Sequence, residues 1–201
     1  MAVTFNDMLA AVYDITKRPE LVTITKSAIK RATIRAHSVD FFPRDRSSVV
    51  FSFTPTTDGS FTDISGLYTA APLYRIGELL QCEDIVTQRP TENLEYIVGI
   101  DEFWDENNQR RTSVFTQVGE SLRCSFAAAT GRARLWYYAM PDTSDSSYSS
   151  WIADRHTEEV AQWAAGIVWL RTGLQEQAQG ADLQVQSFKD LLVTTYLSSK
   201  V

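Results

Sequence analysis

A group of carboxylates around a tryptophan is the arrangement in this sequence that could most directly support catalysis or metal binding. Asp101, Glu102, Asp105 and Glu106 flank Trp104. A glycosidase uses two carboxyls beside a bound sugar, and an aromatic ring offers the sugar a stacking surface. The acids also resemble a calcium loop, but they lack the alternating ligands, central glycine and terminal glutamate of an EF-hand. We interpret the segment as an exposed turn after a strand, because no second, separated acid supports glycan cleavage.

Other catalytic and cofactor signatures are not found in the sequence. The two histidines, His37 and His156, lie in no nucleophile motif, and we expect both on a helix surface or at a helix cap. The phosphate-binding patterns GxxxxGK(S/T) and GxGxxG do not occur. Cys82 and Cys124 are far apart, so the usual zinc-site spacings are not met. We therefore expect a protein that is not an enzyme and that uses no cofactor or metal.

A stripe of cations in the N-terminal part could bind phosphates. Lys26, Lys30, Arg31 and Arg35 lie along one side of an expected helix. The stripe is short, has no aromatic residue between its cations, and belongs to a chain of net charge -6, so sequence-specific DNA binding is not expected. An acidic protein partner and a solvated surface remain as alternatives.

The charges of the chain are separated along the sequence. The 201 residues include 19 Lys plus Arg and 25 Asp plus Glu. Residues 17–46 sum to +5, whereas residues 58–110 sum to -8. Such a chain can present faces of opposite charge to different partners. With 44% hydrophobic residues the chain is expected to fold, and we expect neither a secretory signal nor a membrane span.

The N-terminal residues predict two helices. Thr4 and Asp7 form an acidic variant of a capping box before a helix over residues 5–15. A second helix is predicted from Pro19 to Ala36, since proline is tolerated in the first turn.

The middle of the chain predicts short strands. Alternation over residues 49–53 starts a series that continues at 74–80, 94–100, 112–118, 122–127 and 133–140. The spacing favours a small antiparallel sandwich or barrel without parallel crossovers. Alternation also places the aromatic run Trp136-Tyr137-Tyr138 on both faces of its strand, so that half of the run belongs to the core.

The C-terminal part again predicts helices. After Pro141, residues 142–150 have the composition of a linker, a helix spans 151–172 with Gly173 as its cap, and a last helix spans 182–197. Whether residues 180–201 dock on a partner or pack as a last helix stays open. The expected fold is α+β, with a helical bundle from residues 1–46 and 142–201 and an inserted antiparallel β-sandwich or barrel-like domain over 47–141.

Two stretches carry a resemblance to a known family. Residues 13–21, continued through 28–45, resemble the N-terminal helical region of head-to-tail adaptor proteins of tailed bacteriophages. The run Leu135-Trp136-Tyr137-Tyr138-Ala139-Met140-Pro141, followed by residues 151–170, is similar to the last strand and following helix of the short-tailed phage adaptors, the tail tubular protein A or gatekeeper type. The resemblance spans nearly the whole chain as an order of elements and carries no catalytic motif.

The resemblance implies a structural role in the virion neck. Such adaptors form a homo-oligomeric ring, commonly a dodecamer, beneath the portal protein at the portal vertex. The ring extends the DNA channel, lies close to the genome without sequence-specific contact, and provides the platform for tail or nozzle proteins. It is assembled in the host cytoplasm and needs no cofactor and no membrane. The alternatives are a glycan-acting virion enzyme and a β-rich binding module.

The ring implies two different, complementary patches on each subunit. The +5 and -8 segments are candidates for these patches, and a negative net charge suits a channel through which DNA slides. Small and aromatic residues on the C-terminal helices suit close packing between subunits. The interface candidates are Lys26, Lys30, Arg31, Arg35, Trp163, Gly166, Trp169 and Tyr196.

Overall fold

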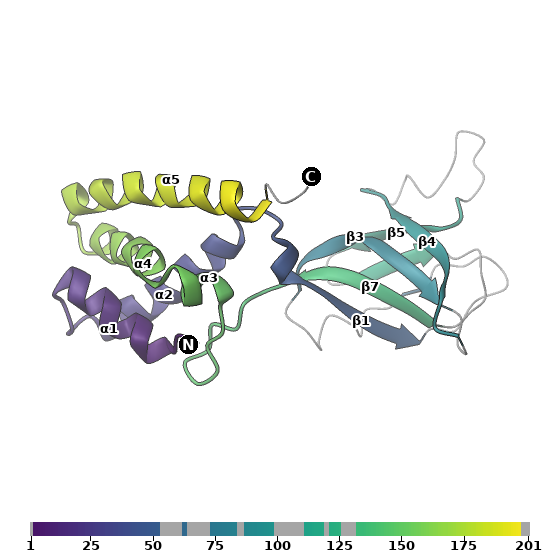
Figure 1. The fold of residues 1–201 in the computed structure, drawn as a ribbon, viewed down its shortest axis with the longest axis horizontal. Coiled ribbons are helices and arrows are strands. Elements are labelled where there is room, and N and C mark those ends of the chain that lie inside the picture. The colour runs from purple at the N-terminus through teal and green to yellow at the C-terminus, as the bar shows by residue number, and fades with distance from the viewer. Residues whose placement is uncertain are drawn as a thin grey trace. The chain divides into compact units, whose positions relative to one another are not determined.

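The protein is a mixed α+β chain that divides into two compact units (Figure 1). The computed structural model describes residues 2–52, 62–63, 73–83, 87–98, 111–118, 121–125 and 132–197. Residues 1–44 and 140–201 form one unit, which we name the helical unit, and residues 45–139 form the other, the β-unit. The helical unit is therefore built from both ends of the chain, and the β-unit is inserted between them.

Helix α1 (Phe5–Thr16) begins at the predicted capping box, which is confirmed. The Asp7 backbone N–H donates to the Thr4 hydroxyl at 3.2 Å, and the Thr4 N–H donates to the Asp7 carboxylate at 2.9 Å. The helix ends at Lys17, whose φ of 55° is left-handed and whose N–H donates to the Tyr13 carbonyl. Phe5, Met8 and Val12 form its buried face.

Helix α2 (Val22–His37) starts three residues later than Pro19, so the predicted start is wrong. The Leu21 N–H donates to the Arg18 carbonyl at 3.2 Å, which places Pro19 and Glu20 in a turn. Helix α2 therefore begins only after the left-handed Lys17 and this turn. The buried side of α2 consists of Thr25, Ala28, Ile29, Ala32, Thr33, Ala36 and His37.

The helix predicted over residues 151–172 is two helices, α3 (Trp151–Arg155) and α4 (Thr157–Arg171). His156, at φ -134° and ψ 50°, interrupts them and is both the C-cap of α3 and the N-cap of α4. Helix α4 packs against α1, α2, α3 and α5, so apolar residues occupy most of its circumference. The predicted cap at its end is confirmed: Gly173 has a φ of 80°, and the Leu174 N–H donates to the Trp169 carbonyl at 2.9 Å.

Helix α5 (Gln175–Leu197) is the last packed helix of the helical unit. It begins seven residues before the predicted start and lies along α4 (Figure 1). Its buried side chains are Ala178, Ala181, Val185, Phe188 and Leu192. The C-terminal region thus packs as a last helix as far as residue 197, and docking on a partner stays a prediction; residues 198–201 lie outside the described residues.

Residues 142–150, predicted to be a linker, are held against the helices as part of a segment that we name the 140–150 segment. Asp142 and Ser149 form an isolated β-bridge, with the Ser149 N–H donating to the Asp142 carbonyl at 2.9 Å. The Ser150 hydroxyl lies 2.9 Å from Nε2 of His37, and both residues are buried. His37 is therefore an interior residue, which corrects the expectation of a surface or capping position. His156 is at a cap, as expected.

The β-unit contains a seven-stranded sheet in the described residues, and a short 3₁₀ turn spans the sequence boundary between the two units. The strand order is β1-β7-β3-β4-β5-β6-β2, which is open at β1 and β2, so these residues form no closed barrel. The pairs β1·β7, β3·β7, β3·β4, β5·β6 and β2·β6 are antiparallel. The elements are η1 (Pro43–Asp45), β1 (Arg46–Ser52), β2 (Thr62–Asp63), β3 (Leu73–Glu83), β4 (Pro90–Tyr96), β5 (Val114–Val118), β6 (Ser121–Ser125) and β7 (Arg132–Ala139).

One strand pair contradicts the purely antiparallel expectation. β4 and β5 pair in parallel, with Glu95 opposite Val114 and Tyr96 opposite Phe115. Parallel neighbours need a connection of a dozen or more residues, and residues 97–113 supply it. Strand β7 shows the expected alternation, with Ala133, Leu135 and Tyr137 buried and the residues between them half-buried.

Candidate interaction surface of the helical unit

The stripe of four cations on α2 divides into two pairs with different roles. Lys26 Nζ donates to the Asp145 carboxylate at 2.7 Å, and Lys30 Nζ lies 3.0 Å from its other oxygen. These hydrogen bonds hold the pKa of Asp145 below its usual value, the bond from Lys26 having the largest effect. Lys26 and Lys30 thus fasten the 140–150 segment to α2, and each keeps about 40% of its side chain exposed.

Arg31 and Arg35 form the second pair, and both are exposed. Neither forms an ion pair with any residue that the structure describes. One helical turn separates them, so they project from the same side of α2. They are the two of the four predicted cations whose charges remain available to a partner.

Trp163 is a core residue with one face under a lysine. It is 6% exposed, meets Phe188 of α5 edge-on, and has Lys189 Nζ 5.3 Å from its ring centre. A cation over a tryptophan ring is attracted by the electrons of the ring face. Trp163 therefore connects α4 to α5 within one chain.

Gly166 is a point of close approach between α4 and α5. A Cβ placed on Gly166 would lie 2.9 Å from the Cβ of Ala181, which is closer than real Cβ contacts. The small residue thus permits close packing, as its type suggested, but the partner that the structure gives it is α5 of the same chain.

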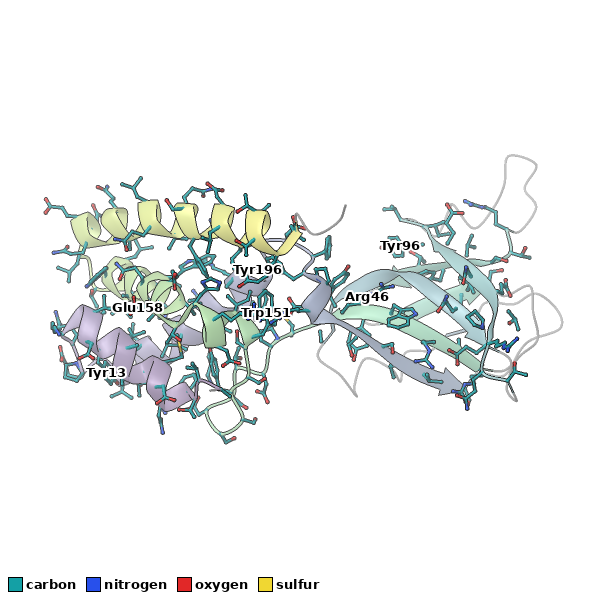
Figure 2. All side chains as sticks on the ribbon, viewed as in Figure 1. Tyr13, Arg46, Tyr96, Trp151, Glu158 and Tyr196 are labelled. Atoms are coloured by element: carbon teal, nitrogen blue, oxygen red, sulfur yellow. The ribbon has the colours of Figure 1, made fainter. Side chains whose placement is uncertain are left out.

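The remaining two aromatic candidates also make contacts within the helical unit. The Tyr196 hydroxyl lies 2.9 Å from Nε2 of His156, and its ring packs edge-on against Trp151 at 4.9 Å between centres. Figure 2 shows Tyr196 and Trp151 near each other at one end of the helical unit. Trp169 is partly buried against the core and supplies the carbonyl that caps α4.

Two grooves flank α5. The first, which we name the basic groove, has a volume of about 440 Å³. The second, which we name the acidic groove, has a volume of about 220 Å³. The basic groove is lined by Arg35, Ser38, Val39, Trp163, Asp182, Val185 and Lys189; the acidic groove is lined by Glu158, Glu159, Gln162, Gln184 and Val185.

Helix geometry explains why the grooves lie on opposite flanks of α5. Asp182 and Lys189 are two turns apart and share one flank, whereas Gln184 is rotated by roughly 200° from Asp182. Val185 contacts both grooves from the buried side of the helix. A single helix thus separates two depressions of different composition.

The charges of the two grooves are opposite. The basic groove contains two cations and one carboxylate, from Arg35, Lys189 and Asp182. The acidic groove contains the carboxylates of Glu158 and Glu159 and no Lys or Arg among its lining residues. Figure 2 labels Glu158 on α4. Glu158 has no ion pair among the described residues, and Glu159 has only His156 Nδ1 at 3.6 Å.

A second cluster of functional side chains lies on the β-unit and was not among the residues predicted from the sequence. The Trp136 ring has the Arg46 guanidinium 4.7 Å from its centre and that of Arg134 at 5.9 Å, and its Nε1 donates to Gln81 at 2.9 Å. Figure 2 labels Arg46 on β1. Arg132, Arg134 and Trp136 alternate along β7 and so share one face of the strand. This spacing was the sequence signal from which a row of cations beside Trp136 could have been predicted.

Glu83 anchors the row of cations. It is 2% exposed and accepts from Arg134 Nε at 2.5 Å and from Arg132 Nε at 3.0 Å. The hydrogen bond from Arg134 contributes most to holding the pKa of Glu83 below its usual value, against the opposing effect of burial. A carboxylate of the acidic 58–110 segment is thus neutralised within the β-unit.

No family model and no curated protein matches this chain. The function of the chain is therefore inferred from its sequence and from the geometry of the described residues.

The predicted carboxylate cluster at residues 101–106 lies outside the described residues. Within the ranges that the structure describes, no group of three or more His, Cys, Asp or Glu side chains is placed to hold a metal ion. None of the described helices combines the length and the apolar composition needed to cross a bilayer.

Proposed function

We propose that this protein is a structural component of the phage neck, a head-to-tail adaptor ring that binds the portal protein, extends the DNA channel and carries the tail or nozzle. The observation that carries the proposal is the construction of the helical unit. Segments before and after the β-unit in the sequence pack together around α4, so the β-unit is an insertion. Two grooves of opposite charge lie on the flanks of α5.

Two different surfaces on one unit are what a ring of identical subunits requires. A closed ring larger than a dimer repeats a heterologous contact, in which one patch meets a different patch of the next copy. The basic and acidic grooves differ in lining and charge and thus fit this requirement. In this proposal the helical unit forms a ring-building bundle, and the β-unit is a sandwich-like domain inserted into its sequence.

The role needs no catalytic centre. The contacts of the sequence-derived candidates support packing and charge presentation: Trp163, Gly166 and Tyr196 stabilise the helical unit, whereas Arg31 and Arg35 stay exposed. The net charge of -6 favours passage of DNA through a channel, because a basic lumen would hold phosphates in place.

The test is to image the full chain by electron microscopy, alone and mixed with portal rings of the same phage, and to measure its mass by sedimentation. We expect rings of identical subunits, commonly twelve, coaxial with the portal in the mixture. A chain that stays monomeric in both conditions, over a wide concentration range, would contradict the proposal.

A further inference from the structure

We propose that the acidic groove of one copy docks against the basic groove of the next copy, with Glu158 and Glu159 facing Arg35 and Lys189. The partner of the surface is thus a second copy of this chain, bound head to tail. The inference rests on the proposed function, since it names the contact that builds the ring.

The placement of the two grooves favours a second copy of this chain as the binding partner. They lie on opposite flanks of α5 and carry opposite charges, so a second copy in the same orientation can bring one beside the other. Each copy then uses one groove toward each neighbour, which is the heterologous arrangement that closes into a ring.

The charges that this contact needs are available. Arg35 and Glu158 have no ion pair among the described residues, and Lys189 has its ammonium over the Trp163 ring without a described carboxylate paired to it. The other two cations of the α2 stripe, Lys26 and Lys30, already bind Asp145 and are excluded from the contact.

Apolar side chains in the walls of the basic groove strengthen its attraction for carboxylates. Val39, Trp163 and Val185 are apolar surfaces beside Arg35 and Lys189. A low-dielectric wall strengthens attraction between opposite charges once water is excluded. Asp182 at the same groove reduces the positive charge, and the two cations against one carboxylate leave the groove net positive.

This contact takes the place of the +5 and -8 segments as the pair of complementary patches. Both grooves belong to the helical unit, and part of each charged segment is neutralised inside its own unit, through Asp145 in one case and through Arg132 and Arg134 in the other.

Charge exchange between two variants tests the contact. The basic-groove variant, Arg35→Glu with Lys189→Glu, makes both grooves acidic, and the acidic-groove variant, Glu158→Lys with Glu159→Lys, makes both basic. Each variant alone should associate roughly 100-fold more weakly than the wild type, because like charges then meet. An equimolar mixture should regain rings, since acidic and basic grooves again alternate.

Assembly of each full-length variant and of their mixture is measured by sedimentation and electron microscopy, in the condition in which the wild type forms rings. Circular dichroism verifies folding, and Glu158→Gln with Glu159→Gln serves as a milder variant that should lose part of the association. The variant Lys17→Glu with Arg18→Glu has the same charge change as the basic-groove variant at an exposed turn, and its assembly should stay unchanged.

The outcomes separate this inference from the proposed function. If the wild type forms rings and either reversed variant assembles equally well, or the mixture is not rescued, the contact is overturned while the adaptor role stands. If the wild type forms no rings with or without portal, both fail. If the basic-groove variant loses binding to a fluorescent DNA duplex but keeps assembly, the basic groove is a phosphate site and the inference is wrong.

Discussion

The hydroxyl of Tyr148 lies 2.8 Å from the hydroxyl of Thr33 inside the helical unit. Thr33 donates its own proton to the Ile29 carbonyl at 2.9 Å, so Tyr148 is the donor in this pair. The contact joins the 140–150 segment to α2 across 115 residues of sequence. The segment that enters α3 is therefore part of the core, and its side chains contribute to stability.

Tyr148→Phe should cost about 1 kcal/mol of unfolding free energy, because it removes one buried hydrogen bond. Tyr148→Ala should cost about 3–5 kcal/mol, because it also removes the edge-on contact with Phe5. Urea denaturation followed by helical circular dichroism measures both. The control is Tyr13→Phe: the Tyr13 hydroxyl is buried without a hydrogen-bond partner among the described residues, so its loss should leave stability unchanged or raised. Equal stability of wild type and Tyr148→Ala would mean that the segment is only a linker.

Gly166→Ala should destabilise the helical unit by about 1–3 kcal/mol, because the added methyl overlaps Ala181. A second change, Ala181→Gly, should restore much of the loss by removing the opposing methyl. Gly180→Ala is the matched control, since a Cβ there meets no atom within 4 Å, and it should stabilise α5 by about 0.5–1 kcal/mol. Thermal denaturation of the four proteins measures the set; a neutral Gly166→Ala would show that α4 and α5 do not pack this closely.

Glu83→Gln should destabilise the β-unit by about 2–3 kcal/mol, because it removes charged hydrogen bonds to two arginines. Glu95→Gln is the same chemical change at an exposed ion pair with Arg111 and should cost under about 1 kcal/mol. Hydrogen exchange of the β3 and β7 amides measures the effect in the unit where it arises. Similar protection in the two variants would contradict the anchoring role of Glu83.

Acid should weaken the 140–150 segment over a defined pH window. The Asp142 carboxylate accepts from the Ser144 hydroxyl, the Ser147 hydroxyl and the Ser144 backbone N–H, which lower its pKa from 3.8 to about 2. A lowered folded-state pKa gives stability that is present above pH 3.8 and lost as the pH falls toward about 2. Melting temperatures between about pH 5 and pH 2 should therefore fall less steeply in Asp142→Asn. An identical slope in both proteins would contradict this contribution.

Local signals in the sequence predicted several elements closely. The capping box at Thr4 and the glycine at residue 173 act through neighbouring backbone groups, so their effect is contained in a few residues. The alternation predicted along β7 is also found in the structure, where one face of that strand is buried.

Features decided by distant contacts were missed or misplaced. His156, at the break between α3 and α4, forms a hydrogen bond with Tyr196, which is 40 residues away in the sequence. The parallel pairing of β4 with β5 joins strands that are separated by residues 97–113, so local sequence patterns do not reveal it.

The candidate site shows the same limit. The four cations of α2 could be identified in the sequence. Which of them are paired and which stay unpaired depends on Asp145, which lies 119 residues after Lys26. The basic groove exists because α5 brings Lys189 beside Arg35 and Trp163. The row of arginines around Trp136 also depends on the pairing of β7 with β1 and β3, which spacing along the chain does not give.

The placement of α4 has a consequence for synthesis. Helices α1 and α2 bury their apolar faces mainly against α4, which leaves the ribosome only after the whole β-unit. At ~5–20 residues per second, the roughly 125 residues between the end of α2 and the middle of α4 take about 6–25 seconds. During this interval the first two helices are exposed while the β-unit can already fold. The newly made chain is therefore most vulnerable to aggregation and to chaperone capture in α1 and α2, until α4 is synthesised and completes the helical unit.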